Sequence, residues 1–258
     1  MVHGSRWLYP PDAPDLNHNP ETIAFFGEEC RGMHVCKPLA DFAQRLGFLH
    51  NPTIGGHFAF NVNEIDAMKE RLQAAGVPYT DAGTFAIAGV VQIYFYDPSM
   101  NVIEVNQIIE PSGGTGPRAG EAHDIHREPG DWYIHHVCLA VHELGRSVDF
   151  FENIVGIGHA QSESAKGSSD IAVFGTDYRG LHLVEPNPEA AQTLGTMHNP
   201  TIGGHYAITV PDLSVTISRL DALGVSYSAP DVPTFPGVRQ LYVFDPEYRL
   251  VEVNEILG

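Results

Sequence analysis

The stretch HNPTIGGH occurs at residues 50–57 and again at residues 198–205. The two copies are offset by 148 residues. The same offset aligns YFYDPSMNVIEVNQI at 94–108 with YVFDPEYRLVEVNEI at 242–256, and no gap is needed from Ile23 to Ile108. The chain is therefore an internal duplication. It comprises an N-terminal domain (1–110), a linker rich in Gly, Pro and charge (111–131) and a C-terminal domain (132–258).

Composition excludes several classes of partner. The 258 residues carry a formal charge of −18, so a nucleic acid or an anionic membrane would be repelled. No apolar run is long enough to span a bilayer, and the N-terminus has no secretory pattern. The three cysteines (Cys30, Cys36 and Cys138) form no disulfide framework, which indicates a reducing cytoplasm. We also expect a homo-oligomer.

The C-terminal copy alternates strands with single amphipathic helices. YIHHVCLAV (133–141) and HYAITV (205–210) are typical strands, while 142–156 and 212–224 have helical spacing, the latter closed by Gly224. The order β-α-β-β occurs twice, with room for one more short strand in each unit. We therefore expect an α+β fold in which two such units curl their sheets into a half-open cup with the helices outside.

Three polar side chains are expected on the same face of these strands. Alternation places His136, His205 and Glu252 opposite the apolar positions that pack under the helices. Two histidines and one carboxylate on one side of a metal leave positions open for substrate and oxygen, an arrangement that suits non-haem Fe(II). The alternative is that each His is a solvated or hydrogen-bonded strand residue, since the chain has 14 histidines.

With these segments in order, the C-terminal half resembles a domain of the vicinal oxygen chelate superfamily. This superfamily includes glyoxalase I, bleomycin-resistance proteins and type I extradiol dioxygenases. The resemblance rests on IHHVCLAVHELGRSVDFFENIVGIG (134–158), GGHYAITVPDLSVTISRLDALGV (203–225) and FDPEYRLVEVNE (244–255), and reaches 20–108 through the repeat. It implies paired βαβββ modules, with metal ligands at positions that match His136, His205 and Glu252.

The extradiol branch is the most similar in detail. Its signature places a Tyr, then Asp-Pro, then the ligand Glu, as in LYVFDPEYRLVE (241–252), which makes Tyr242 a candidate catalytic residue. The resemblance also implies an acid/base His, best matched by His182. Each has a structural alternative: Tyr242 as a core tyrosine, and His182 as a fold residue, because His34 is its counterpart. The chain departs from the signature at 233–235, where a His is expected, and at Tyr248, where Gly or Pro is expected.

The leading hypothesis is oxidative cleavage of a small catechol-like substrate by O2 on Fe(II). Three free metal positions would serve the two substrate oxygens and O2. His182 would move a proton, and Tyr242 would hydrogen-bond a substrate oxygen. One alternative is a glyoxalase-like isomerase or lyase using Mn(II), Zn(II), Ni(II) or Co(II). Another is a non-catalytic protein that binds an aromatic drug.

The repeated loop predicts a second, incomplete site. His57 and Glu104 are the counterparts of His205 and Glu252, but the counterpart of His136 would fall before Met1. His3 aligns with a helical position and does not replace it. We therefore expect the N-terminal domain to lack its first strand and helix and to be metal-free; the alternative is that the missing strand comes from elsewhere. The loop would deliver the ligand strand to the cup, and His198 or Asn199 would line the substrate pocket.

Overall fold

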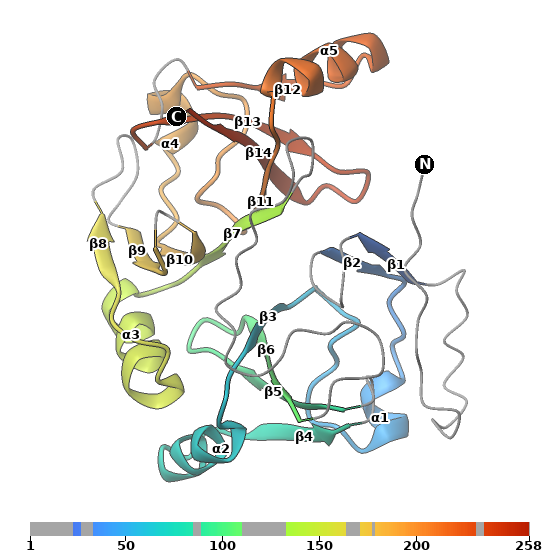
Figure 1. The fold of residues 1–258 in the computed structure, drawn as a ribbon, viewed down its shortest axis with the longest axis vertical. Helices are drawn as coiled ribbons and strands as arrows, with labels where there is room; N and C mark the ends of the chain where they lie inside the picture. Colours follow the sequence, from blue (N-terminus) through green and yellow to red (C-terminus); the bar gives the residue numbers. More distant parts are fainter. Residues whose placement is uncertain are drawn as a thin grey trace. The chain divides into compact units, whose positions relative to one another are not determined.

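The computed structural model describes residues 23–26, 33–84, 89–109, 133–163, 171–176, 179–230 and 235–257. The chain divides into two compact units, Met1–Asp124 and Ile125–Gly258, and each is described by itself. The predicted linker, 111–131, and His3 lie outside the described residues. Two tandem α+β units with open sheets confirm the predicted fold class (Figure 1).

The C-terminal domain is built on one eight-stranded sheet of order β12-β13-β14-β11-β7-β10-β9-β8. Its first module contains β7 (Tyr133–Ala140), α3 (Leu144–Asp149), the π-helical segment η1 (Phe150–Val155), β8 (Gln161–Glu163), β9 (Ile171–Phe174) and β10 (Gly180–Val184). A short helix, α4 (Ala190–Leu194), leads to the second module. That module contains β11 (His205–Thr209), α5 (Leu213–Leu223), β12 (Tyr227–Ser228), β13 (Val238–Phe244) and β14 (Leu250–Ile256). The two βαβββ modules join where β7 pairs antiparallel with β11.

The helix α5 shows how the second module closes over its core. It begins after Asp212, whose side chain accepts a hydrogen bond from the backbone N–H of Ser214, and ends at Gly224 in the left-handed conformation. It lies along one face of the sheet (Figure 1), where its Leu213 belongs to an apolar cluster with the strand residues Leu241, Val251 and Val253. Among the described residues, no helix has the length and apolar character needed to cross a membrane.

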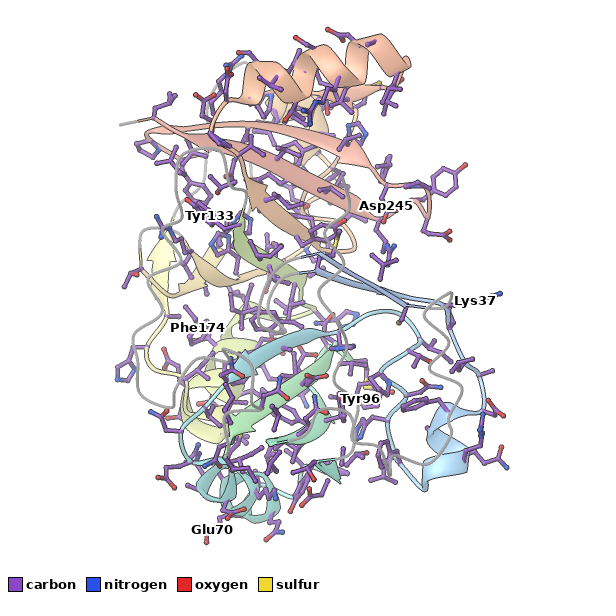
Figure 2. All side chains as sticks on the ribbon, turned by 45° about the vertical axis from the view of Figure 1, so that its right-hand side comes forward. Lys37, Glu70, Tyr96, Tyr133, Phe174 and Asp245 are labelled. Atoms are coloured by element: carbon purple, nitrogen blue, oxygen red, sulfur yellow. The ribbon has the colours of Figure 1, made fainter. Side chains whose placement is uncertain are left out.

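The N-terminal domain repeats the second module closely. Its four-stranded sheet has the order β3-β6-β5-β4, which matches β11-β14-β13-β12 of the sister domain. Its elements are β3 (Phe58–Asn61), α2 (Ile65–Ala74), β4 (Tyr79–Gly83), β5 (Val90–Tyr96) and β6 (Val102–Ile108). Tyr96 marks the end of β5 in Figure 2. The side chains buried under α2 include Ile65, Met68 and Leu72.

Only part of a first module is described in this domain. The hairpin β1 (Ile23–Phe26) and β2 (Met33–Cys36) lies 148 residues before β9 and β10, and α1 (Phe42–Leu46) lies the same distance before α4. Among the described residues, no strand pairs with β3 on the side where β7 pairs with β11. The absence of a first strand and helix therefore stays a prediction for the whole domain.

One glycine of the repeated loop shows how the two domains differ beside the first strand. Gly204 has φ +73°, and a Cβ there would lie 2.5 Å from the backbone oxygen of Cys138 on β7. The loop thus needs glycine both for its conformation and for its approach to the first strand. The counterpart Gly56 has φ +78° but no described atom within 4 Å of the same position. Its conformation is kept, while the close approach is not seen among the described residues.

Candidate metal centre

Three adjacent strands place the predicted ligands on one face of the sheet. His136 on β7 lies opposite Ala207 on β11, and Ala207 lies beside Glu252 on β14. His205 precedes Ala207 by two residues and so projects from the same face. The three side chains come from the two modules at the point where the modules join.

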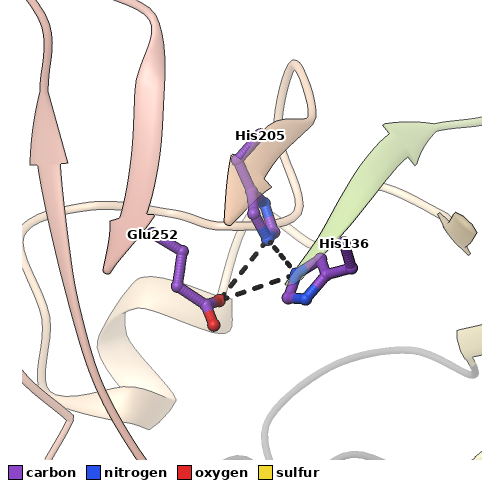
Figure 3. Close-up of side chains that lie close together, drawn as sticks. All are labelled: His136, His205 and Glu252. Carbon is purple, nitrogen blue, oxygen red and sulfur yellow. Dashed lines mark hydrogen bonds and ion pairs between the residues drawn. The ribbon is translucent and has the colours of Figure 1, made fainter. Parts of the chain in front are cut away.

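Their ligand atoms converge, as Figure 3 shows. The Nε2 atoms of His136 and His205 are 3.2 Å apart. Glu252 Oε2 lies 3.9 Å from Nε2 of His136 and 3.6 Å from Nε2 of His205. Ligands bonded at ~2.1 Å and at right angles about a metal lie ~3 Å apart. The spacing therefore fits a metal ion that takes one atom from each side chain, and among the described residues no other cluster of three potential ligands occurs.

Hydrogen bonds hold the ligand atoms toward this point. His205 donates from Nδ1 to the carbonyl oxygen of Pro200, 2.9 Å away, which leaves Nε2 free for a metal. Asn254 donates to Oε1 of Glu252 at 2.9 Å, leaving Oε2 free, and accepts a 2.6 Å hydrogen bond from Thr209. Asn254 and Thr209 lie two and four residues from Glu252 and His205, so strand alternation puts them on the ligand face, but nothing in the sequence indicates this chain of contacts.

Electrostatics favour the protonation states that a cation requires. Burial alone would raise the pKa of Glu252, but the hydrogen bond and charge of His205 and the hydrogen bond of Asn254 lower it. Burial, together with the charges of His182, His205 and His135, holds the pKa of His136 well below its ordinary value. Glu252 is therefore ionised and His136 neutral near pH 7, and both states are needed for metal ligation.

A cavity lies beside the three ligands. Its polar lining includes His182, Thr201 and Tyr242 as well as the ligands. Its apolar lining consists mainly of five side chains: Cys138, Ile171, Val184, Leu194 and Phe235. The cavity therefore combines a polar, potentially metal-bearing side with an apolar wall, as small-molecule sites commonly do.

Both predicted catalytic residues line this cavity. His182 is 2% exposed, and its ring stacks on that of His136 with centroids 4.0 Å apart and planes 16° apart. Tyr242 is also 2% exposed and lies opposite Glu252 in the sheet, with its hydroxyl hydrogen-bonded to Gln240. These positions suit contact with a substrate, while the catalytic roles stay predictions.

The predicted substrate residues of the loop lie elsewhere. His198 is 3% exposed, bonds Ser228 Oγ through Nδ1 at 2.6 Å, and packs on Phe244. Asn199 donates to the carbonyl oxygen of Asn187 and accepts from Thr201, so it fixes the loop. Neither is among the residues lining the cavity. Substrate contact by His198 and Asn199 stays an untested prediction that this geometry does not favour.

In the N-terminal domain, the counterparts of His205 and Glu252 form an ion pair, and the hydrogen bonds around them are kept. His57 Nε2 lies 3.1 Å from Glu104 Oε2. His57 Nδ1 bonds the Pro52 carbonyl at 2.9 Å, and Asn106 donates to Glu104 at 2.8 Å, as their counterparts do. The His57 side chain is 22% exposed and that of His205 only 6%, because no described strand covers the edge of β3.

Comparison with known proteins identifies the family of this fold. The model of the Glyoxalase/Bleomycin resistance protein/Dioxygenase superfamily matches residues 9–105 and 133–253. The chain belongs to this superfamily. Its two matched segments correspond to the two repeated units, which confirms the resemblance drawn from the sequence motifs. No curated protein sequence matches the chain.

Solved structures of the superfamily share the fold at low identity. BphC, a halotolerant catechol dioxygenase, matches with a TM-score of 0.54 and 17% identity, over 77% of this chain and 66% of its own. The 2,2',3-trihydroxybiphenyl 1,2-dioxygenase from Sphingomonas wittichii strain RW1 gives 0.53 and 17%, over 77% and 70%. A Mn(II)-bound glyoxalase from Novosphingobium aromaticivorans gives 0.54 and 15%, over 78% and 62%. The chain spans about two thirds of the length of these proteins, and the likeness shows the fold alone.

Proposed function

We propose that the C-terminal domain binds Fe(II) through His136, His205 and Glu252, and that the protein cleaves a catechol-like substrate with O2 in the extradiol manner. The observation that carries the proposal is the convergence of two imidazole nitrogens and one carboxylate oxygen beside an apolar-walled cavity. Two histidines and one carboxylate are the donor set typical of non-haem Fe(II) oxygenases. When bound, the metal supplies charge stabilisation and a template for substrate and O2.

The protein's own residues orient the substrate and move its protons. The apolar wall, with Phe235 and Leu194, suits an aromatic ring and excludes water from it. Tyr242 donates its hydroxyl hydrogen to a substrate oxygen. His182 accepts a proton from a substrate hydroxyl and returns it, since an imidazole exchanges protons near neutral pH. Its stacking on His136 keeps the ring beside the ligands without ligating the metal.

Metal analysis of matched variants tests the site. His136→Ala, His205→Ala and Glu252→Ala should each remove tight Fe(II) binding after anaerobic loading while the domain stays folded, because each removes one of three ligands. The matched controls are His57→Ala and Glu104→Ala, which should keep the wild-type metal content. Full occupancy in all three ligand variants would refute the site.

An oxygen electrode tests the reaction. Fe(II)-loaded protein should consume O2 with at least one member of a catechol panel, and none of the three ligand variants should do so. Turnover without O2 uptake would indicate a glyoxalase-like isomerase instead. Ligand binding that survives metal chelation, with no turnover, would indicate a binding protein.

A further inference from the structure

Two histidines follow one another on β7 where its pairing with β11 is irregular. In a regular strand, His135 and His136 would point to opposite faces of the sheet. Ala207 of β11 lies opposite His136, and the next residue, Ile208, lies opposite Ile134. His135 is therefore an extra residue without a partner in β11. Such a β-bulge redirects the side chains at its position.

The bulge coincides with a direct contact between the two imidazoles. Nδ1 of His135 lies 2.9 Å from Nδ1 of His136, with ring centroids 5.2 Å apart. His135 is 4% exposed and His136 is 3% exposed, so water does not compete for this hydrogen bond. The Nε2 atom of His135 has no hydrogen-bond partner among the described residues. Among the described residues, the His135 ring thus hydrogen-bonds through Nδ1, and its partner is His136.

The chemistry of metal ligation determines which ring donates. His136 points Nε2 at His205 and Glu252, and a metal there needs the lone pair of that nitrogen. A neutral imidazole with a free Nε2 lone pair carries its hydrogen on Nδ1. Nδ1–H of His136 must then donate to His135, whose own hydrogen sits on Nε2. The reverse tautomers would place a hydrogen on Nε2 of His136 and block the metal.

Both histidine ligands are then oriented through Nδ1, by different groups. For His205 the acceptor is the backbone carbonyl of Pro200. For His136 it is a side chain, which a substitution can remove. A hydrogen-bond partner of this kind fixes the tautomer and ring orientation of a ligand and raises its basicity.

We propose that His135 is a positioning residue for the metal centre, which accepts the Nδ1–H of His136 and so keeps Nε2 available to the metal. This inference rests on the proposed metal site. His135 touches neither metal nor substrate, and its effect passes entirely through His136.

Two substitutions separate this role from mere packing. In His135→Asn, the amide oxygen stands near the former Nδ1 and can still accept the hydrogen bond, whereas His135→Leu offers no acceptor. The Co(II) affinity, measured by competition with a chromophoric chelator, should fall about 10- to 100-fold in the Leu variant. It should stay within about threefold of wild type in the Asn variant. His50→Leu is the control, because it removes another buried histidine whose Nδ1 bonds a side chain, Thr80, and should leave Co(II) affinity unchanged.

A second measurement does not depend on these variants folding. Long-range ¹H–¹⁵N NMR spectra of the Zn(II)-loaded wild-type protein should show the hydrogen of His136 on Nδ1 and that of His135 on Nε2. A hydrogen on Nδ1 of His135 would overturn the inference. So would a folded Leu variant with wild-type Co(II) affinity, or an Asn variant as weak as the Leu variant. If the wild-type protein fails to bind Co(II), or His136→Ala binds it equally well, the metal site itself is refuted and this inference falls with it.

Discussion

Replacement of Glu104 by Gln tests whether the N-terminal domain has exchanged a metal site for an ion pair. The Glu104 carboxylate pairs with His57, and its side chain is 9% exposed. Burial alone would raise its pKa. The hydrogen bond and charge of His57 outweigh this, with help from Asn106 and Tyr94, and lower the pKa from 4.5 to about 2. A carboxylate with a lowered folded-state pKa stabilises the domain above its unfolded pKa, and this stabilisation is lost as the pH falls through the folded value.

The size of the expected stability change follows from the lowered pKa of Glu104. One pKa unit corresponds to about 1.4 kcal/mol, so the ionised carboxylate contributes about 3 kcal/mol at neutral pH, of which about 2 kcal/mol is lost by about pH 3. The pKa of His57 is raised: burial would lower it, but the hydrogen bond and charge of Glu104 prevail. Its contribution is present below 6.5 and is lost as the pH rises through the folded-state pKa. The pair is therefore strongest between about pH 4.5 and 6.5.

Urea unfolding, followed by the NMR amide signals of β5 and β6, measures this domain within the full chain. Between pH 6 and pH 3, the wild-type protein should lose about 2 kcal/mol more unfolding free energy than Glu104→Gln made together with His57→Gln, since the double variant has neither the carboxylate nor a lone buried imidazole to protonate. Glu252→Gln, the counterpart in the other domain, should leave the pH dependence of these signals unchanged. Parallel losses in the wild type and this double variant would show that Glu104 is not held as a charged partner of His57.

Three further substitutions concern the C-terminal domain. His182→Gln should keep the metal but lower turnover about 100-fold or more, with His34→Gln as the control; reduced thermal stability with unchanged turnover would make His182 structural. Tyr242→Phe should keep the metal and lower kcat/KM at least about 10-fold by removing a hydrogen bond to a charged substrate oxygen, and an unchanged value would assign Tyr242 to packing. Thr209→Val should weaken Co(II) binding about 10-fold by releasing Asn254 from its place beside Glu252; chelator competition would reveal an unaffected site.

The duplication and the strand alternation predicted the fold and brought the three ligand candidates together. This worked because a two-residue period fixes the face of a strand wherever one face packs under a helix, as Leu241 and Val253 do. Alternation also puts Tyr242 and His182 on the faces opposite Leu241 and Leu183, and both line the cavity.

The remaining features depend on departures from that regular pattern. Alternation assigns His135 to the face opposite His136, and only the bulge in β7 brings the two rings together. His198 is conspicuous in the sequence, but Ser228 engages it inside the fold, and the matching contact of His50 with Thr80 shows that this role is common to both domains. A residue that is repeated in both copies, as His50 and His198 are, can therefore serve the fold of each domain rather than its chemistry.

The location of the ligands at the junction of β7 and β11 also has a consequence for assembly. His136 belongs to the first βαβββ module, whereas His205 and Glu252 belong to the second. A metal ion bound there would link the two modules of the domain, because neither module supplies three ligands alone. At a free metal concentration about 100 times the dissociation constant, such binding adds about 2.7 kcal/mol to the paired state. Fragments cut between β10 and β11 should thus reassemble more tightly with metal present, because the proposed metal would also link the two modules.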